Sequence, residues 1–304
     1  MKWEDFRSSD NVEDRTGDSG GGFPVGGGMK LGGGALILVV VVSLLFGVNP
    51  LTLIGGLESG APAPPESSQP APGYGPQRGT PAPGQGAAPP RATRDQAKDF
   101  SARILGDTED VWGAIFQAAG SRYTAPKLVL FRGAVQSACG RASAAVGPFY
   151  CAQDRAVYLD TEFFDELSRR FKAPGDFAQA YVIAHEIGHH VQNLTGTMRQ
   201  VDAQMQQQDA RGRNALSVRL ELQADCYAGV WAYFAQRRNM LDVGDLEEGF
   251  TAASAIGDDQ IQKRTQGYIV PDSFTHGTSE QRLRWFKTGL GSGDMRRCDT
   301  FAAR

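Results

Sequence analysis

Two of the four histidines in the chain lie four residues apart, in His185-Glu186-Ile187-Gly188-His189. Residues i and i+4 of an α-helix share one face, so both imidazoles can bind a single zinc ion. Glu186, beside the first histidine, can then accept a proton from a water on that ion. The pattern predicts a Zn2+ site with His185 and His189 as ligands, the alternative being two ordinary helical histidines. We interpret His190 as a polar neighbour, not as a ligand.

A catalytic zinc ion takes three protein ligands and keeps one position open for water. Glu221, in Glu221-Leu-Gln-Ala-Asp225, is the candidate third ligand because it lies on the next strongly helical segment. Asp225 lies one turn further along the same face, where it can accept the free ring N–H of a ligand histidine. The residues around them are largely apolar, and a buried carboxylate needs a metal ion or another partner.

Hydrophobic periodicity predicts the elements that position these side chains. The motif lies in a predicted helix that starts at Asp176 and ends at Gly196. Further helices are expected at 94–119 (with a break near Gly106), 214–236, 243–263 and 279–287, and strands at 127–131 and 156–160. The fold class is therefore α+β: a mostly helical zincin-like domain with a small sheet. Residues 200–213 form either a lid or an exposed loop.

Four cysteines, Cys139, Cys151, Cys226 and Cys298, allow three pairings. The first two lie 12 residues apart around a glycine-rich turn, so we favour that pair, which leaves Cys226 with Cys298. Some of them could instead be buried free thiols. A four-thiolate zinc site is improbable because its short paired spacings are absent. Two disulfides would suit a domain outside the cytoplasm.

Residues 31–57 contain no charged residue, and residues 35–54 would span about 30 Å as a helix, which matches a bilayer core. We therefore predict one transmembrane helix at 31–57. The alternative is a cleaved signal peptide, because Ala61-Pro62-Ala63 is similar to a cleavage site. The long, acidic segment before the apolar run argues against cleavage.

The flanking cations predict the orientation of this helix. Lys30 immediately precedes the apolar stretch, whereas no Lys or Arg follows it before Arg78. We therefore expect residues 1–30 to form a cytoplasmic low-complexity segment and the protein to be a single-pass membrane protein. Residues 58–93 are a linker rich in Pro, Ala and Gly, and residues 94–304 are the extracytoplasmic catalytic domain, periplasmic or at the cell surface. A net charge of −3 gives no reason to expect a nucleic-acid partner.

The motif His185–His189 followed by Glu221–Asp225 resembles that of the gluzincin metallopeptidases. Within them, the chain is most similar to the bacterial neutral zinc metallopeptidases of the YpfJ type. Other stretches share the likeness: residues 9–14, 137–140, 147–151 and 157–160. The resemblance implies a zinc-dependent endopeptidase with His185, His189 and Glu221 as ligands. It also implies that Glu186 is the catalytic base and that Asp225 orients the first histidine.

Peptide hydrolysis through a zinc-activated water also needs a hydrogen-bond donor opposite the metal. His276, in Thr275-His-Gly-Thr-Ser-Glu-Gln-Arg282, is our candidate. This segment resembles the Thr-His-Pro segment of HtpX-type proteases, with Gly277 where proline is usual. Tyr268 and Arg282 are further candidates, and the alternative is that His276 only caps the last helix.

The expected function is hydrolysis of peptide bonds in exported or membrane-associated proteins, with the protein held at the membrane by one N-terminal helix. Residues 156–160 are predicted as an edge strand to which a peptide substrate adds; the alternative is an interior strand. A second function class is an inactive, metal-stabilised peptidase-like scaffold or binding protein of the envelope. The base Glu186 favours the enzyme, because a structural zinc has no need of one. Processing of peptidoglycan or lipoproteins is a third possibility.

Overall fold

The structure is a computed structural model that describes residues 1–17, 94–143 and 146–302. The predicted transmembrane helix at 31–57 and the linker at 58–93 lie outside these residues. None of the helices within the described ranges has both the length and the apolar character needed to cross a bilayer.

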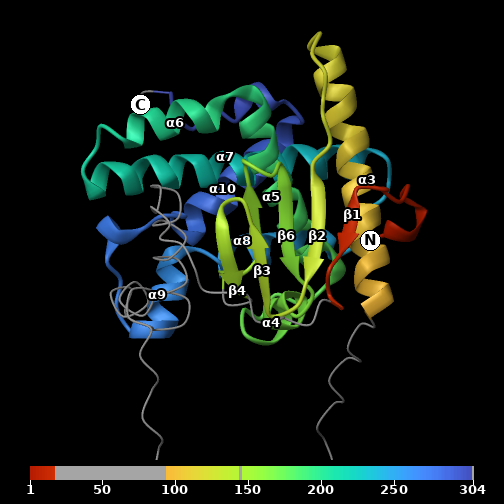
Figure 1. The fold of residues 1–304 in the computed structure, drawn as a ribbon, viewed down its shortest axis with the longest axis horizontal. Helices are drawn as coiled ribbons and strands as arrows, with labels where there is room; N and C mark the ends of the chain where they lie inside the picture. The colour runs from red at the N-terminus through yellow and green to blue at the C-terminus, as the bar shows by residue number, and fades with distance from the viewer. Residues whose placement is uncertain (18–93, 144–145, 303–304) are drawn as a thin grey trace, which may run out of the picture.

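The central sheet has four strands in the order β1-β2-β6-β5 (Figure 1). These strands are β1 (Val12–Asp14), β2 (Lys127–Phe131), β6 (Ala156–Asp160) and β5 (Phe149–Cys151). β6 runs parallel to β2 and antiparallel to β5, and all five of its residues are buried. The prediction that residues 156–160 form the edge was therefore wrong, because β5 covers that side and is the edge strand. β3 (Ala134–Ser137) and β4 (Gly140–Ser143) form a separate antiparallel hairpin.

Helices make up most of the remaining chain. They are α3 (Arg94–Ala118), α4 (Phe163–Arg169), α5 (Asp176–Thr195), α6 (Thr197–Met205), α7 (Ala210–Arg237), α8 (Asp245–Ala255), α9 (Asp258–Gln266) and α10 (Ser279–Ser292), with 3-10 turns η1 (Trp3–Asp5), η3 (Pro271–Ser273) and η4 (Met295–Arg297). The mostly helical α+β class is confirmed. Three details differ from the elements expected from the sequence. α3 continues through Gly106, and the segment 243–263 is divided into α8 and α9. Residues 200–213 lie in the end of α6, a turn and the start of α7.

The helix predicted for 243–263 is divided at Gly257. This residue precedes α9, and its backbone is extended, with φ −69° and ψ 142°, so the helical path is interrupted here. A Cβ atom on Gly257 would lie 2.4 Å from the backbone nitrogen of Ser279. The chain at this point therefore packs directly against the start of α10.

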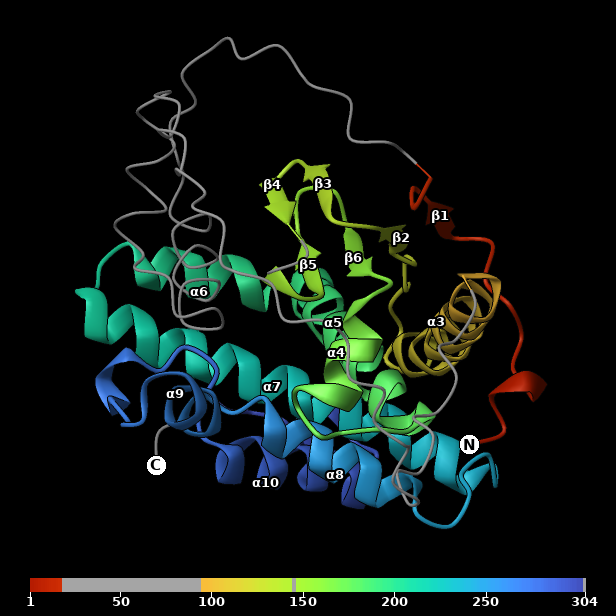
Figure 2. The same ribbon diagram turned by 90° about the horizontal axis from the view of Figure 1, so that it is seen from below.

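The helix α5, which carries His185, Glu186 and His189, lies between the sheet and a layer formed by α7, α8 and α10 (Figure 2). Strand residues alternate between two cores, as the period of two requires. Leu128 and Leu130 of β2 pack into the main core with α5, whereas Val129 and Phe131 pack beneath the β3–β4 hairpin. The sheet thus fixes one side of α5, and the helical layer fixes the other.

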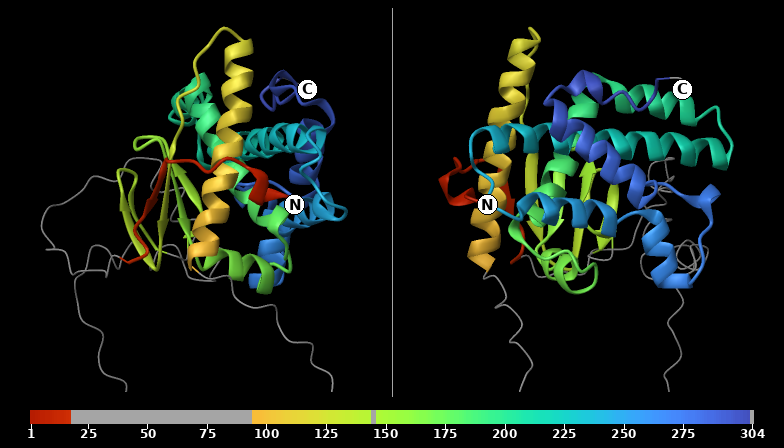
Figure 3. Two further views of the ribbon diagram at one scale, coloured as in Figure 1. Left: turned by 90° about the vertical axis from the view of Figure 1, so that its right-hand side faces the viewer. Right: turned by 180° about the vertical axis from the view of Figure 1, so that it is seen from behind.

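The folded domain includes residues 1–17, which the sequence analysis had separated from it. β1 pairs in parallel with β2, and the preceding residues lie along α3 (Figure 3). The domain is therefore assembled from two parts of the chain, residues 1–17 and the residues from 94 onward.

Both predicted disulfides are present. Cys139 is bonded to Cys151, which ties the β3–β4 turn to the edge strand β5. Cys226 is bonded to Cys298, which ties α7 to the C-terminal segment. No cysteine of the chain is free.

Candidate metal centre

The helix α5 carries His185, Glu186 and His189, and its boundaries agree with the sequence. It begins at Asp176 and ends before Gly196, which adopts the left-handed conformation typical of a helix C-cap glycine. The rings of His185 and His189 project from one face, with centroids 4.8 Å apart. The helical spacing thus brings two imidazoles to one point.

Glu221 reaches this point because α5 and α7 pack very closely. A Cβ atom on Gly188 would lie only 2.9 Å from the backbone oxygen of Ala224, so a larger residue would push α7 away. Glu221 Oε2 lies 3.2 Å from Nε2 of His185, and Oε1 lies 3.4 Å from Nε2 of His189. Gly188, between the two candidate ligand histidines, therefore has a packing role in assembling the site.

The three side chains fit a zinc ion. One nitrogen or oxygen from each of His185, His189 and Glu221 lies within 4.8 Å of the other two. Two imidazole nitrogens and one carboxylate are a donor set that catalytic zinc uses. Burial opposes the ionisation of Glu221, but the neighbouring imidazoles of His189 and His276 hold its pKa well below the usual range. The site therefore offers an anionic ligand between two histidines.

A buried carboxylate orients the first histidine. Nδ1 of His185 lies 2.8 Å from Asp225, which leaves Nε2 facing Glu221. Arg282 donates to both oxygens of Asp225 at 2.9 Å, and the Tyr181 hydroxyl donates to it at 2.5 Å. Burial opposes the ionisation of Asp225, but Arg282 and His185 keep its pKa below the ordinary value. Asp225 thus lies beside the first histidine, as the sequence predicts.

The second histidine has its own partner, Gln192, which the sequence analysis missed. Nδ1 of His189 lies 2.9 Å from the side-chain oxygen of Gln192. The amide nitrogen of Gln192 donates to the backbone oxygen of Leu220, which precedes Glu221. Its spacing of three residues from His189 places it on the same helical face, and this signal was available in the sequence.

His276 lies at the same site and is held by Asp258, a second residue that the sequence analysis missed. Nδ1 of His276 lies 3.2 Å from Asp258, whose other oxygen accepts the backbone N–H groups of residues 275–277. Burial opposes the ionisation of Asp258, but His276 lowers its pKa. The cap of α10 is Thr278, with its side chain bonded to the nitrogen of Gln281, so His276 is not that helix's cap.

The other two donor candidates lie elsewhere or are already bound. Tyr268 is 63% exposed and lies outside the lining of the cavity at this site. Arg282 lines the cavity but is 2% exposed and engaged by Asp225. His276 is therefore the best placed of the three.

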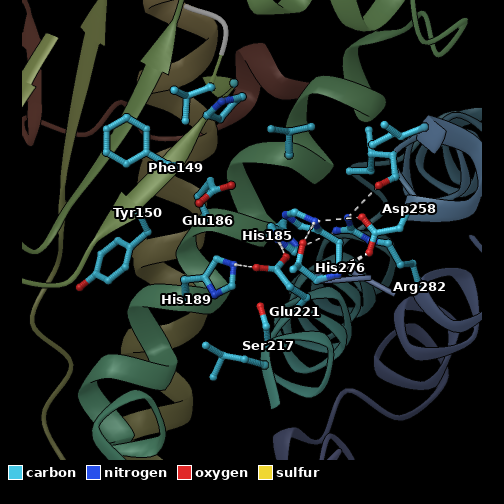
Figure 4. A pocket seen from close by; sticks show the side chains of 18 of the residues that line it. Phe149, Tyr150, His185, Glu186, His189, Ser217, Glu221, Asp258, His276 and Arg282 are labelled. Carbon is cyan, nitrogen blue, oxygen red and sulfur yellow. Dashed lines mark hydrogen bonds and ion pairs between the residues drawn. The ribbon is translucent and has the colours of Figure 1, made fainter. Parts of the chain in front are cut away.

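A cavity of about 340 Å³ opens over these residues (Figure 4). Glu186 lies in its wall, where burial raises the pKa of its carboxyl and the two histidines partly offset the effect. The rest of the wall is mainly apolar and comes from the edge strand, α4, α5, α6 and α9: Phe149, Tyr150, Phe163, Val182, Met198, Met205 and Ile261. The cavity thus combines a candidate metal centre, a carboxylate and a long apolar surface.

His190 takes no part in the metal site. It is buried, its Nδ1 lies 2.9 Å from the hydroxyl of Tyr150, and its Nε2 lies 2.6 Å from the backbone oxygen of Thr124. It links α5 to the edge strand, in agreement with its interpretation as a polar neighbour.

Comparisons with known proteins identify the family of this chain. The family model described as "Putative neutral zinc metallopeptidase" matches residues 1–301. YpfJ of Escherichia coli strain K12 is 45% identical over 306 residues, covering 99% of each chain. Rv2575 of Mycobacterium tuberculosis strain H37Rv is 42% identical over 233 residues, covering 73% of this chain and 78% of that protein. No solved structure matches the chain significantly. The resemblance inferred from the motifs is confirmed, and this chain belongs to the neutral zinc metallopeptidase family.

Proposed function

We propose that the protein is a zinc-dependent endopeptidase with His185, His189 and Glu221 as its metal ligands. The observation that carries this proposal is the convergence of these three side chains in the wall of a cavity that also contains Glu186. A zinc ion held there would polarise the scissile carbonyl and lower the pKa of the attacking water.

Two side chains would serve the hydrolysis, one by moving a proton and the other by stabilising the developing negative charge. Glu186 would accept the proton of the attacking water and pass it to the leaving amine. Its buried position disfavours a permanent charge and supports this exchange. His276 would donate a hydrogen bond from Nε2 to the carbonyl oxygen as negative charge develops there. Burial opposes a charge on this ring, but Glu221 and Asp258 raise its pKa, so Nδ1 can donate to Asp258 at the same time.

The edge strand β5 is the proposed docking site for the substrate backbone. β5 pairs with β6 on one side, and no other strand within the described part of the chain pairs with its second side. Phe149 and Tyr150 of this strand also line the cavity. A peptide added alongside β5 would therefore run past Glu186, with main-chain hydrogen bonds that do not depend on its sequence.

Exported or membrane-associated proteins are the proposed substrates. The two disulfides support a location outside the cytoplasm. The apolar residues 31–57 support an association with the membrane.

The Glu186→Gln variant tests the enzyme against the scaffold. It should bind zinc as the wild type does but lose cleavage of an unfolded protein such as casein. Glu247→Gln, which changes an exposed acid on α8, should leave both properties intact. A zinc-loaded wild type without peptidase activity would favour the scaffold, and an active Glu186→Gln variant would remove Glu186 from the mechanism.

A further inference from the structure

The first 17 residues are an integral part of the catalytic domain. Strand β1 continues the parallel pairing of β2, with Val12 opposite Leu128 and Asp14 opposite Leu130. The backbone nitrogen of Leu128 donates to the oxygen of Asn11 at 2.9 Å. Without this segment, β2 would be left with an unpaired edge.

Apolar and steric contacts hold the same segment on α3. Phe6 is buried in the main core, and the ring of Trp3 packs edge-on against Phe100 at 5.4 Å. The backbone of Arg7 approaches α3 so closely that a Cβ atom on Gly106 would lie 2.1 Å from its carbonyl oxygen. Such a contact requires glycine at this position of the helix.

Charged groups complete the attachment. Arg7 forms ion pairs with Glu109 and Asp110 of α3 at 2.8 and 2.9 Å. Met1 is buried, and its α-ammonium group lies 3.0 Å from Asp176 and 3.2 Å from Asp245. Burial opposes the charge on this amine, but the hydrogen bond to Asp176 leaves its pKa raised. Asp176 is the first residue of α5, so the segment is bonded to the start of the helix that carries the metal ligands.

These contacts involve the sheet, the core and α5, and they can form only if both parts of the chain occupy one compartment. We propose that residues 1–17 lie on the same side of the membrane as the active site. A single crossing by residues 31–57, with the N-terminus in the cytoplasm and the domain outside, would place the two parts of one fold on opposite sides. Because the disulfides suit an oxidising compartment, the N-terminal segment belongs there with them. This inference does not depend on peptidase activity or on zinc.

Cysteine labelling in bacterial cells that express the full chain tests the proposal. The wild type has no free cysteine and supplies the unlabelled baseline. Asp10→Cys reports on the N-terminal segment and Gln207→Cys on the catalytic domain, and both positions are exposed. Spheroplasts are treated with a membrane-impermeant maleimide before and after lysis.

The proposal expects both positions to be labelled in intact spheroplasts. Labelling of both positions only after lysis would contradict the shared oxidising compartment. Labelling of one position in intact spheroplasts and of the other only after lysis would overturn it. Glu4→Cys, at a second exposed position of the segment, repeats the measurement if Asp10→Cys does not accumulate. Labelling measures location alone, so its outcome is separate from that of the peptidase assay.

Discussion

Nδ1 of His189 lies 2.9 Å from the side-chain oxygen of Gln192, one turn further along α5. The amide nitrogen of Gln192 donates to the oxygen of Leu220, so the amide oxygen must face the histidine. His189 therefore donates from Nδ1 and keeps the lone pair of Nε2 directed at the metal site. Because Leu220 precedes Glu221, Gln192 also connects the second and third proposed ligands.

Gln192→Met should weaken zinc binding by about 10- to 100-fold, the usual cost of losing a partner that orients a metal ligand. The measurement is a zinc dissociation constant from competition with a chelator. Gln204→Met, the same exchange at an exposed position on α6, should leave the constant unchanged. An unchanged constant in Gln192→Met would show that the hydrogen bond does not support the site.

Arg282→Met should destabilise the protein by about 3–5 kcal/mol, because it removes the guanidinium that donates to both oxygens of the buried Asp225 carboxylate. Asp225→Asn should also be destabilising, since it leaves the guanidinium unpaired. The double variant should lose less stability than the sum of the two, because neither unpaired charge remains. Urea unfolding of the four metal-free proteins measures this cycle, and additive losses would show that the pair is not coupled.

The local parts of the site could be predicted from sequence because helical geometry sets them. His185, Glu186 and His189 share one helix turn, and Asp225 follows Glu221 at the spacing that keeps both on one face. Asp258 could not be found in this way. It lies 18 residues before His276, and only the packing of α9 against the start of α10 brings them together.

The sheet shows why the rest of the fold was harder to predict. β6 is almost continuously apolar, which is typical of a strand buried on both faces inside a sheet, and this signal argued against an edge. The pairing of β1 with β2 joins residues 12–14 to 128–130 across the whole intervening chain. Such long-range pairing has no local periodicity, so the N-terminal part of the domain was not recognised.

His276→Ala should lower kcat by about 100- to 1000-fold, the range found on removal of one donor to a developing oxyanion. Zinc content should not change, because His276 is not one of the three proposed ligands. Tyr268→Phe removes the hydroxyl of an exposed residue outside the cavity and should keep full activity. Full activity in His276→Ala would remove His276 from the mechanism, and a loss of activity in Tyr268→Phe would show that Tyr268 contributes to it.

Stability should fall in acid partly because of His190. Burial lowers its pKa to about 4, with a further lowering by Arg155 and an opposing effect of the bond to Thr124. Between about pH 6.5 and about pH 4, His190 is therefore protonated in the unfolded chain but neutral in the folded chain. The stabilisation is complete above pH 6.5 and is lost as the pH falls through this window. The other groups that face the ring, Tyr150 and Tyr123, stay neutral throughout it.

Urea unfolding of the metal-free wild type and of His190→Gln between pH 7 and about pH 4.5 isolates this effect. The difference in unfolding free energy between the two proteins removes the contributions of the other titrating groups. The free energy of unfolding of the wild type should exceed that of His190→Gln by more at pH 7 than at about pH 4.5. A difference that is independent of pH would show that the pKa of His190 is the same in the folded and the unfolded chain.

Two glycines of α3 provide a matched test of the N-terminal contact. A Cβ atom on Gly106 would lie 2.1 Å from the carbonyl oxygen of Arg7, whereas one on Gly113 would meet open space. Gly106→Ala should destabilise the protein by about 1–3 kcal/mol through this overlap. Gly113→Ala should stabilise it by about 0.5–1 kcal/mol, because alanine is the better helix former. Thermal unfolding of the intact chain measures both variants. The same stabilising shift in both would mean that the backbone of Arg7 does not pack on α3. One of the contacts that support the proposed shared compartment would then be lost.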